Sequence, residues 1–143
     1  MPGATYQVTI QAISDSSNLN FNSSLESPKT IVTTRTALKL TATAPVIGMV
    51  LPNSVVLNYS APQNYHANVV RIYDANQNLI MSYPQFGSGS TIANLSPSTS
   101  YFASVSYIGN GVTLLDSGES PLTAFTTAAP QKLSVSAPAL STA

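Results

Sequence analysis

The chain has 143 residues, of which 43% are hydrophobic and only 7% are charged, with five basic residues against five acidic ones. This composition predicts a folded domain, because disordered chains combine low hydrophobicity with high net charge. The neutral balance argues against nucleic acid and anionic membrane surfaces as partners, and the absence of cysteine excludes disulfides, thiolate catalysis and thiolate zinc sites.

An internal repeat sets the organisation of the chain. Residues 39–45 recur as residues 132–138, and residues 27–34 recur as residues 120–127, both at an offset of 93 residues. Nearer the N-terminus the offset is 95, and the matched pairs are Pro2 with Pro97, Tyr6 with Tyr101, Val8 with Ala103 and Ile10 with Val105. An offset of this size is about one β-sandwich domain, so each period is predicted to be a whole domain.

The repeat divides the chain into three parts. Residues 1–36 are predicted to hold the C-terminal strands of a preceding, incomplete module, and residues 37–128 a complete one. Residues 129–143 are predicted to be a linker and the first strand of a following repeat. A two-stranded hairpin by itself is marginal in water. We therefore expect residues 1–36 either to pair with a neighbouring chain, giving a homo-oligomer by strand pairing, or to pack on the complete module.

Within the complete unit, short apolar and β-branched runs alternate with polar residues and are separated by turn clusters. This pattern predicts an all-β, seven-stranded sandwich without helices. The predicted strands are residues 39–46, 54–60, 68–73, 79–83, 91–95, 100–107 and 122–127. Residues 74–78 are predicted to form the turn between the third and fourth strands, since Asp and Asn tolerate left-handed backbone.

The period of two assigns faces to two of these strands. In the second strand, Val55, Leu57 and Tyr59 share one face, which is predicted to be buried. In the sixth strand, the inward set is predicted to be Tyr101, Ala103, Val105 and Tyr107. The alternate set in the sixth strand, Phe102, Ser104, Ser106 and Ile108, is then predicted to face outward.

The segment Leu95-Ser-Pro97-Ser-Thr-Ser-Tyr101 resembles the signature that leads into the sixth strand of fibronectin type III domains. The resemblance implies an immunoglobulin-like sandwich with a tyrosine corner at Leu95, Pro97 and Tyr101, in which the ring enters the core and the hydroxyl bonds upstream backbone. Residues 2–6 look like the same corner in the first copy. Other immunoglobulin-like sandwiches stay open as alternatives.

Two further segments are similar to strands of this family. Residues 54–62 resemble its second strand, with Tyr59 in the place where the family usually has Trp. Ser120-Pro121, followed by a strand that ends at Thr127, looks like its last strand. The resemblance covers residues 38–128 in full and residues 1–36 in part.

No residue pattern in the chain predicts a catalytic, cofactor or metal site. The single histidine, His66, has no second histidine for a metal pair, and turn chemistry accounts for Asp74, Asp116 and Glu119. Residues 15–22 offer oxygen ligands for calcium, but they carry one charge and lack the distal Glu of a calcium loop. The Gly-Ser run at residues 87–90 lacks the Lys and the helix of a phosphate-binding loop.

Three aromatic residues are candidates for contact with a ligand. Tyr65, Tyr83 and Phe86 lie in predicted loops or at a sheet edge, where exposed rings could stack on sugars. The alternative is that they form a minor hydrophobic core.

The sequence therefore predicts a non-catalytic spacer module of a repetitive extracellular or cell-surface protein, bacterial or phage in origin, with neighbouring repeats as its partners. Proline at Ala44-Pro45 and Ala129-Pro130 is expected to stiffen the junctions between modules. The alternative function is a carbohydrate- or protein-binding accessory module of a polysaccharide-degrading enzyme or a phage fibre. No apolar run is long enough for membrane insertion.

Overall fold

The computed structural model describes residues 2–14, 17 and 22–135, and the part of the chain that it describes contains no helix, and so none that could cross a membrane. The strands are β1 (Thr5–Val8), β2 (Thr30–Thr33), β3 (Leu38–Lys39), β4 (Val46–Leu51), β5 (Ser54–Asn58), β6 (Ala67–Tyr73), β7 (Leu79–Pro84), β8 (Ser90–Ile92), β9 (Ser100–Ile108), β10 (Leu114–Leu115) and β11 (Thr123–Thr126).

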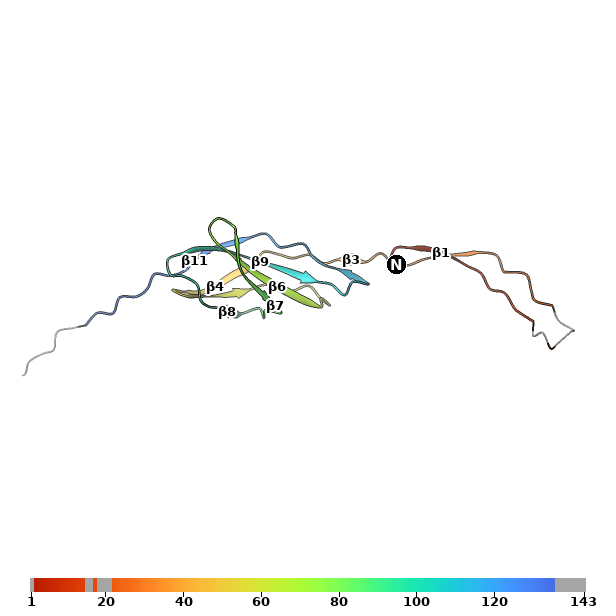
Figure 1. The fold of residues 1–143 in the computed structure, drawn as a ribbon, viewed down its shortest axis with the longest axis horizontal. Helices are drawn as coiled ribbons and strands as arrows, with labels where there is room; N and C mark the ends of the chain where they lie inside the picture. The colour runs from red at the N-terminus through yellow and green to blue at the C-terminus, as the bar shows by residue number, and fades with distance from the viewer. Residues whose placement is uncertain (1, 15–16, 18–21, 136–143) are drawn as a thin grey trace, which may run out of the picture.

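Two antiparallel sheets form the body of the molecule (Figure 1). One sheet has the strand order β4-β5-β8, and the other has the order β11-β9-β6-β7. The longest ladder joins β6 to β9, from Ala67 opposite Ile108 to Tyr73 opposite Phe102. The prediction of an all-β sandwich is confirmed.

The first strand of the sandwich is interrupted. β3 pairs in parallel with β10, whereas β4 pairs antiparallel with β5, so the chain passes from one side of the sandwich to the other between them. Pro45 lies at this crossing, buried, and its carbonyl accepts a hydrogen bond of 2.6 Å from the Thr123 hydroxyl. Proline lacks the N–H that a continuous ladder needs, which explains why the crossing falls there.

This interruption corrects two predictions. A single strand over residues 39–46 was wrong, because only its first residue lies in β3 and only its last lies in β4. The Ala44-Pro45 step lies inside the sandwich and cannot stiffen a junction between modules. The sequence did not predict β4, because glycine and proline are uncommon in strands and β4 contains Gly48 and lies between Pro45 and Pro52. An edge strand with a bulge, such as β4, tolerates these residues.

The last strand is interrupted in the same manner. β10 ends at Leu115, the chain bends through Ser120-Pro121, and β11 begins at Thr123. The predicted strand at residues 91–95 is also shorter than expected. β8 ends at Ile92, because Asn94 has a left-handed backbone with φ of 64°. If each interrupted strand is counted once, the sandwich has seven strands.

The core lies between the two sheets and is almost entirely apolar. Alternate residues of β5, β6 and β9 point into it, as the period of two predicts. Tyr59 is only half-buried at the end of its row. The buried hydrophobic residues are Leu40, Val55, Leu57, Val70, Ile72, Ile92, Leu95, Tyr101, Ala103, Val105, Tyr107 and Phe125.

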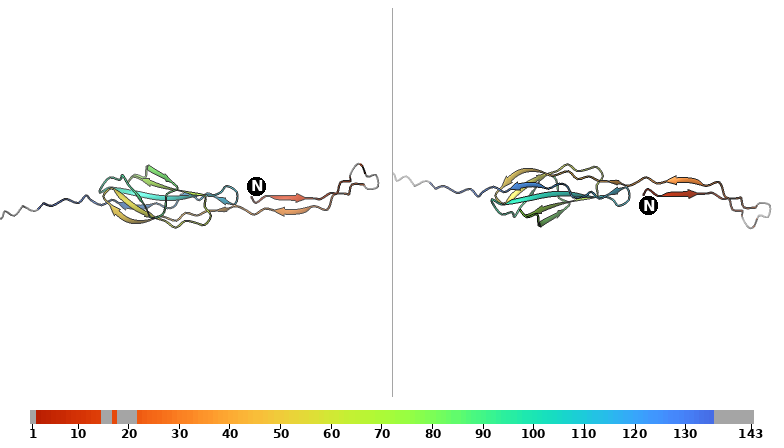
Figure 2. Two further views of the ribbon diagram at one scale, coloured as in Figure 1. Left: turned by 90° about the horizontal axis from the view of Figure 1, so that it is seen from below. Right: turned by 90° about the horizontal axis from the view of Figure 1, so that it is seen from above.

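Strands β1 and β2 form a separate antiparallel hairpin. The hairpin extends beyond one end of the sandwich, and the views from below and above agree that it does not lie on either sheet (Figures 1 and 2). A cleft between the hairpin and the sandwich is lined by Val112 and Thr113 on one side and by Pro2, residues 34–36 and Leu38 on the other. The expected packing of residues 1–36 on the complete module is therefore not what the structure shows.

Candidate functional site

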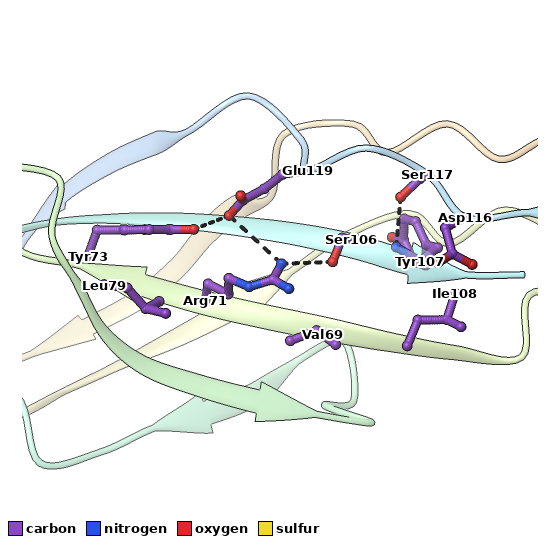
Figure 3. A pocket seen from close by; sticks show the side chains of 10 residues that line it. All are labelled: Val69, Arg71, Tyr73, Leu79, Ser106, Tyr107, Ile108, Asp116, Ser117 and Glu119. Atoms are coloured by element: carbon purple, nitrogen blue, oxygen red, sulfur yellow. Dashed lines mark hydrogen bonds and ion pairs between the residues drawn. The ribbon is translucent and has the colours of Figure 1, made fainter.

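A cluster of polar side chains lies on the outer face of the four-stranded sheet (Figure 3). Arg71 and Tyr73 reach it from β6, Ser104 and Ser106 reach it from β9, and Glu119 comes from the loop that joins β10 to β11. The period of two places these four strand residues on the face opposite the core. Arg71, Tyr73, Ser106 and Glu119 line a cleft of about 580 Å³ together with Asp116 and Ser117.

Glu119 is the centre of this cluster. Its Oε1 accepts hydrogen bonds from the hydroxyls of Tyr73 and Ser104, and the Arg71 Nη1 lies 3.9 Å from the same oxygen. Partial burial alone would raise the pKa of Glu119, but the two hydroxyl donors and the Arg71 charge outweigh it and lower the pKa. Glu119 is therefore held as a carboxylate.

The pKa of Tyr73 shifts in the opposite direction. Partial burial, followed by the hydrogen bond to the Glu119 carboxylate, raises the pKa of the Tyr73 phenol, so it stays protonated as the donor. Arg71 also donates to the Ser106 hydroxyl at 2.9 Å. Each charged group thus has partners within the cluster, which favours a role in holding the loop against the sheet over a role in proton transfer.

Sequence reasoning missed this cluster. Glu119 was assigned to a turn, whereas its partner Tyr73 is 46 residues away in the chain. The sequence signal was the pair of serines, Ser104 and Ser106, on the outward face of β9. The structure shows that Ser104 is fully buried although it faces away from the core. Asp116 does act in a turn, because its Oδ1 accepts the Gly109 N–H at 2.9 Å.

The sequence predicts a tyrosine corner at Leu95, Pro97 and Tyr101. Leu95 and Tyr101 are buried in the core, and Tyr101 stacks on Phe125 with ring centroids 5.6 Å apart. The Tyr101 hydroxyl accepts a hydrogen bond of 2.9 Å from the backbone N–H of Ser96. The hydroxyl is therefore satisfied by upstream backbone, as an acceptor.

Tyr59 lies at the end of the sandwich nearer to β3, in a second polar group. Its hydroxyl donates to the Phe86 carbonyl, and the buried Asn68 amide donates to both of these oxygens at 2.8 Å. Tyr107 packs against Tyr59 at 6.2 Å and donates to the Ser60 carbonyl at 3.0 Å. Burial and the neighbouring phenols Tyr59 and Tyr65 raise the pKa of Tyr107 to about 12.

The three candidate ligand-contact aromatics are all half-buried and pack on the core. Tyr65 meets Tyr107 edge-on at 5.2 Å, and Tyr83 meets Phe86 at 5.7 Å. Tyr65 and Phe86 line one cleft of about 320 Å³ together with His66, whereas Tyr83 is not among its lining residues. The structure therefore brings together two of the three rings at a surface.

The remaining candidates have structural explanations where the structure describes them. His66 is exposed, and its backbone N–H donates to the Ile108 carbonyl at 2.8 Å. Asp74 accepts from the backbone of Asn76 and Asn78 and from the Asn78 amide, contacts that lower its pKa. The candidate calcium segment lies mostly outside the described residues. No group of metal ligands occurs within residues 2–14, 17 and 22–135.

No known family model matches the sequence, and no curated protein matches it either. Solved structures do. The sixth fibronectin type III domain of human fibronectin type III domain containing protein 3 is 16% identical with a TM-score of 0.57, over 68% of this chain and 92% of that one. A fibronectin type III domain derived from human KIAA0970 protein is 19% identical with a TM-score of 0.54, over 70% of this chain and 85% of that one. The chain has a fibronectin type III-like fold.

A two-domain structure matches a larger part of the chain. Domains d3–d4 of the rat CD45 extracellular region are 14% identical with a TM-score of 0.52, over 88% of this chain and 65% of that one. Residues 37–128 make up less than two thirds of the chain. The match to CD45 therefore includes residues outside the sandwich.

Proposed function

We propose that the chain is a non-catalytic spacer segment of a repetitive extracellular or cell-surface protein, with neighbouring repeats as its partners. One observation carries this proposal: the chain enters the sandwich at one end through β3 and leaves it at the opposite end after β11 (Figures 1 and 2). Modules joined in this manner extend along one line. The low charge, the absence of cysteine and the polar Ser, Thr and Asn content support a bacterial or phage surface as the location.

The connections between modules support the same function. Residues 34–37 form a short connection from β2 to β3, and neither they nor residues 127–130 after β11 contain glycine. The Ala128 N–H donates to the Leu51 carbonyl at 3.3 Å, which ties the outgoing chain to the β4–β5 turn. Short, non-glycine linkers bonded to their module limit bending.

Small-angle scattering on a chain of several repeats tests the spacer proposal. We expect a rod-like profile whose maximum dimension grows in proportion to the number of repeats. A matched chain with a flexible Gly-Ser insertion at each junction should give a shorter average dimension. A compact profile from the unmodified repeats would count against the spacer function.

The alternative is a carbohydrate- or protein-binding module, and the cleft that contains Tyr65 and Phe86 is the observation that favours it. A glycan array and a protein pull-down with residues 37–128 would test this function. Loss of binding in Tyr65→Ala and Phe86→Ala, with retention in Leu79→Ala, would support it. No binding at high protein concentration would reject it.

A further inference from the structure

The β1–β2 hairpin reproduces the β9–β11 pair of the sandwich residue by residue. In both pairs the strands are antiparallel, and the register of one is the register of the other at the offsets found in the sequence repeat. The matched pairs are Thr5–Thr33 with Ser100–Thr126, Tyr6–Val32 with Tyr101–Phe125, Gln7–Ile31 with Phe102–Ala124, and Val8–Thr30 with Ala103–Thr123.

The irregular hydrogen bonds beyond the strands are also the same. Ile10 N–H donates to the Ser27 hydroxyl at 3.0 Å, and Val105 N–H donates to the Ser120 hydroxyl at 3.0 Å. Each serine N–H returns a bond of 2.9 Å to the carbonyl of the same partner. Three further pairs of bonds, each from a backbone N–H to a side-chain oxygen, also match. They are Ala4 to Thr34 with Thr99 to Thr127, Ala12 to Ser24 with Tyr107 to Ser117, and Ser14 to Ser23 with Gly109 to Asp116.

The β1–β2 hairpin and the β9–β11 pair differ in what covers them. Tyr101, Ala103, Val105 and Phe125 are buried in the core, whereas their counterparts are exposed to 46% at Tyr6, 47% at Val8, 76% at Ile10 and 46% at Val32. β9 also pairs with β6 along its second edge, but β1 pairs only with β2 in the described structure. The hairpin thus presents one apolar face and one open strand edge, whereas the corresponding face and edge of the β9–β11 pair are buried.

We propose that this hairpin is the docking surface for a five-strand set of the kind that residues 38–95 form in this chain. The occupant completes a second sandwich, with one of its strands on the open edge of β1 and its second sheet on the apolar face. The reason is that β9 and β11, with the same register and the same hydrogen bonds, take these partners here. The match of a two-domain structure beyond the sandwich agrees with this assignment.

The contacts of β6 define the chemistry of the edge strand. Val70 lies opposite Val105 and Ile72 lies opposite Ala103, so the occupant presents β-branched or aliphatic residues to Ile10 and Val8. Ala12 stands where β9 has Tyr107, and Val32 stands where β11 has Phe125. Beside Ala12 and Val32 the hairpin therefore leaves space, which the occupant fills with bulkier side chains than those of residues 38–95.

A fusion protein tests the proposal. A second copy of residues 37–96, fused to residues 2–143 in place of Met1, puts Ser96 next to Pro2, as it stands next to Pro97 in the sandwich. We expect the amide hydrogens of Val8 and Ile10 to exchange roughly a hundredfold more slowly in the fusion than in the 143-residue chain, because they become part of a cooperative fold. A second fusion carries Ala12→Tyr and Val32→Phe, which fill the expected space.

Ile10→Asp in either fusion is the matched control. It should abolish the new protection while the amides of β6 and β9 in the original sandwich stay protected. Slowed exchange in either fusion supports the proposal, and slowed exchange in the refilled fusion alone also identifies the shape that the occupant must have. Fast exchange of the Val8 and Ile10 amides in both fusions would overturn it. The proposal goes beyond the spacer function, since a completed second sandwich could still fail to form a rod.

Discussion

Gly109 follows β9 at the point where the chain turns toward β10, and it has no room for a side chain. A Cβ atom built on it would lie 2.2 Å from the Leu114 carbonyl oxygen, which belongs to the backbone and cannot rotate away. The Gly109 N–H is also fixed by Asp116. Any larger residue must therefore displace the β9–β10 turn.

We expect Gly109→Ala to lower the free energy of unfolding by about 2–4 kcal/mol, because the clash is with backbone in a buried turn. Gly118→Ala is the matched control, since a Cβ there meets nothing within 4 Å. Denaturant unfolding of the two variants measures the difference. Equal midpoints would mean that the turn relaxes without cost.

The Glu119 cluster gives a pH-dependent contribution to stability. The pKa of Glu119 is lower in the folded protein than its ordinary value of 4.5, so the contribution is present above that pH and is lost as the pH falls through the folded pKa. We expect Glu119→Gln to remove this dependence and to cost roughly 1 kcal/mol at neutral pH, since the side chain is partly exposed.

Denaturant unfolding at neutral and acidic pH checks the Glu119 prediction. Glu26→Gln is a suitable control, because Glu26 is an exposed glutamate of the hairpin segment. An acid-induced loss of stability that is the same in the parent chain and in Glu119→Gln would contradict the assignment.

At the scale of elements, matched residues in the two hairpins should respond differently to the same substitution. Val105 is fully buried in β9, and its counterpart Ile10 is largely exposed. We expect Val105→Ala to destabilise the sandwich by about 2 kcal/mol through the cavity that it leaves. Ile10→Ala should change the stability by less than about 0.5 kcal/mol.

Thermal unfolding of the two variants measures this contrast in the 143-residue chain. A large loss of stability in Ile10→Ala, at a concentration where the chain is monomeric, would show that the hairpin packs on the sandwich in solution. The same pair of variants in the fusion protein should give a second transition that responds to Ile10→Ala.

At the scale of the whole molecule, the exposed face and open edge of the hairpin favour pairing with a second chain. We expect the 143-residue chain to associate with rising concentration, and residues 37–143 to stay monomeric. Sedimentation velocity of the two chains tests this, with Ile10→Asp in the longer chain as a control for the apolar face. Identical monomers would rule out a homo-oligomer formed by strand pairing.

Much of the strand pattern could be predicted from the sequence, because alternation along β5, β6 and β9 reports directly which side chains face the core. The two interrupted strands could not, since the crossing at Pro45 depends on which sheet accepts each half of the strand. The cluster around Glu119 also escaped prediction. Its hydrogen bonds join residues that periodicity treats separately, and only the pairing of β6 with β9 brings Arg71, Tyr73 and Ser104 together.

The sequence by itself determined that the chain repeats, and where each strand of one copy has its counterpart in the other. It did so because the same backbone hydrogen bonds require the same serine, threonine and proline positions. Only the tertiary structure decided that the β1–β2 hairpin extends beyond the end of the sandwich and does not pack on it (Figure 1). Whether a residue is buried depends on the strands that pack against it. The residues of β1 and β2 alone do not show whether other strands pack on them.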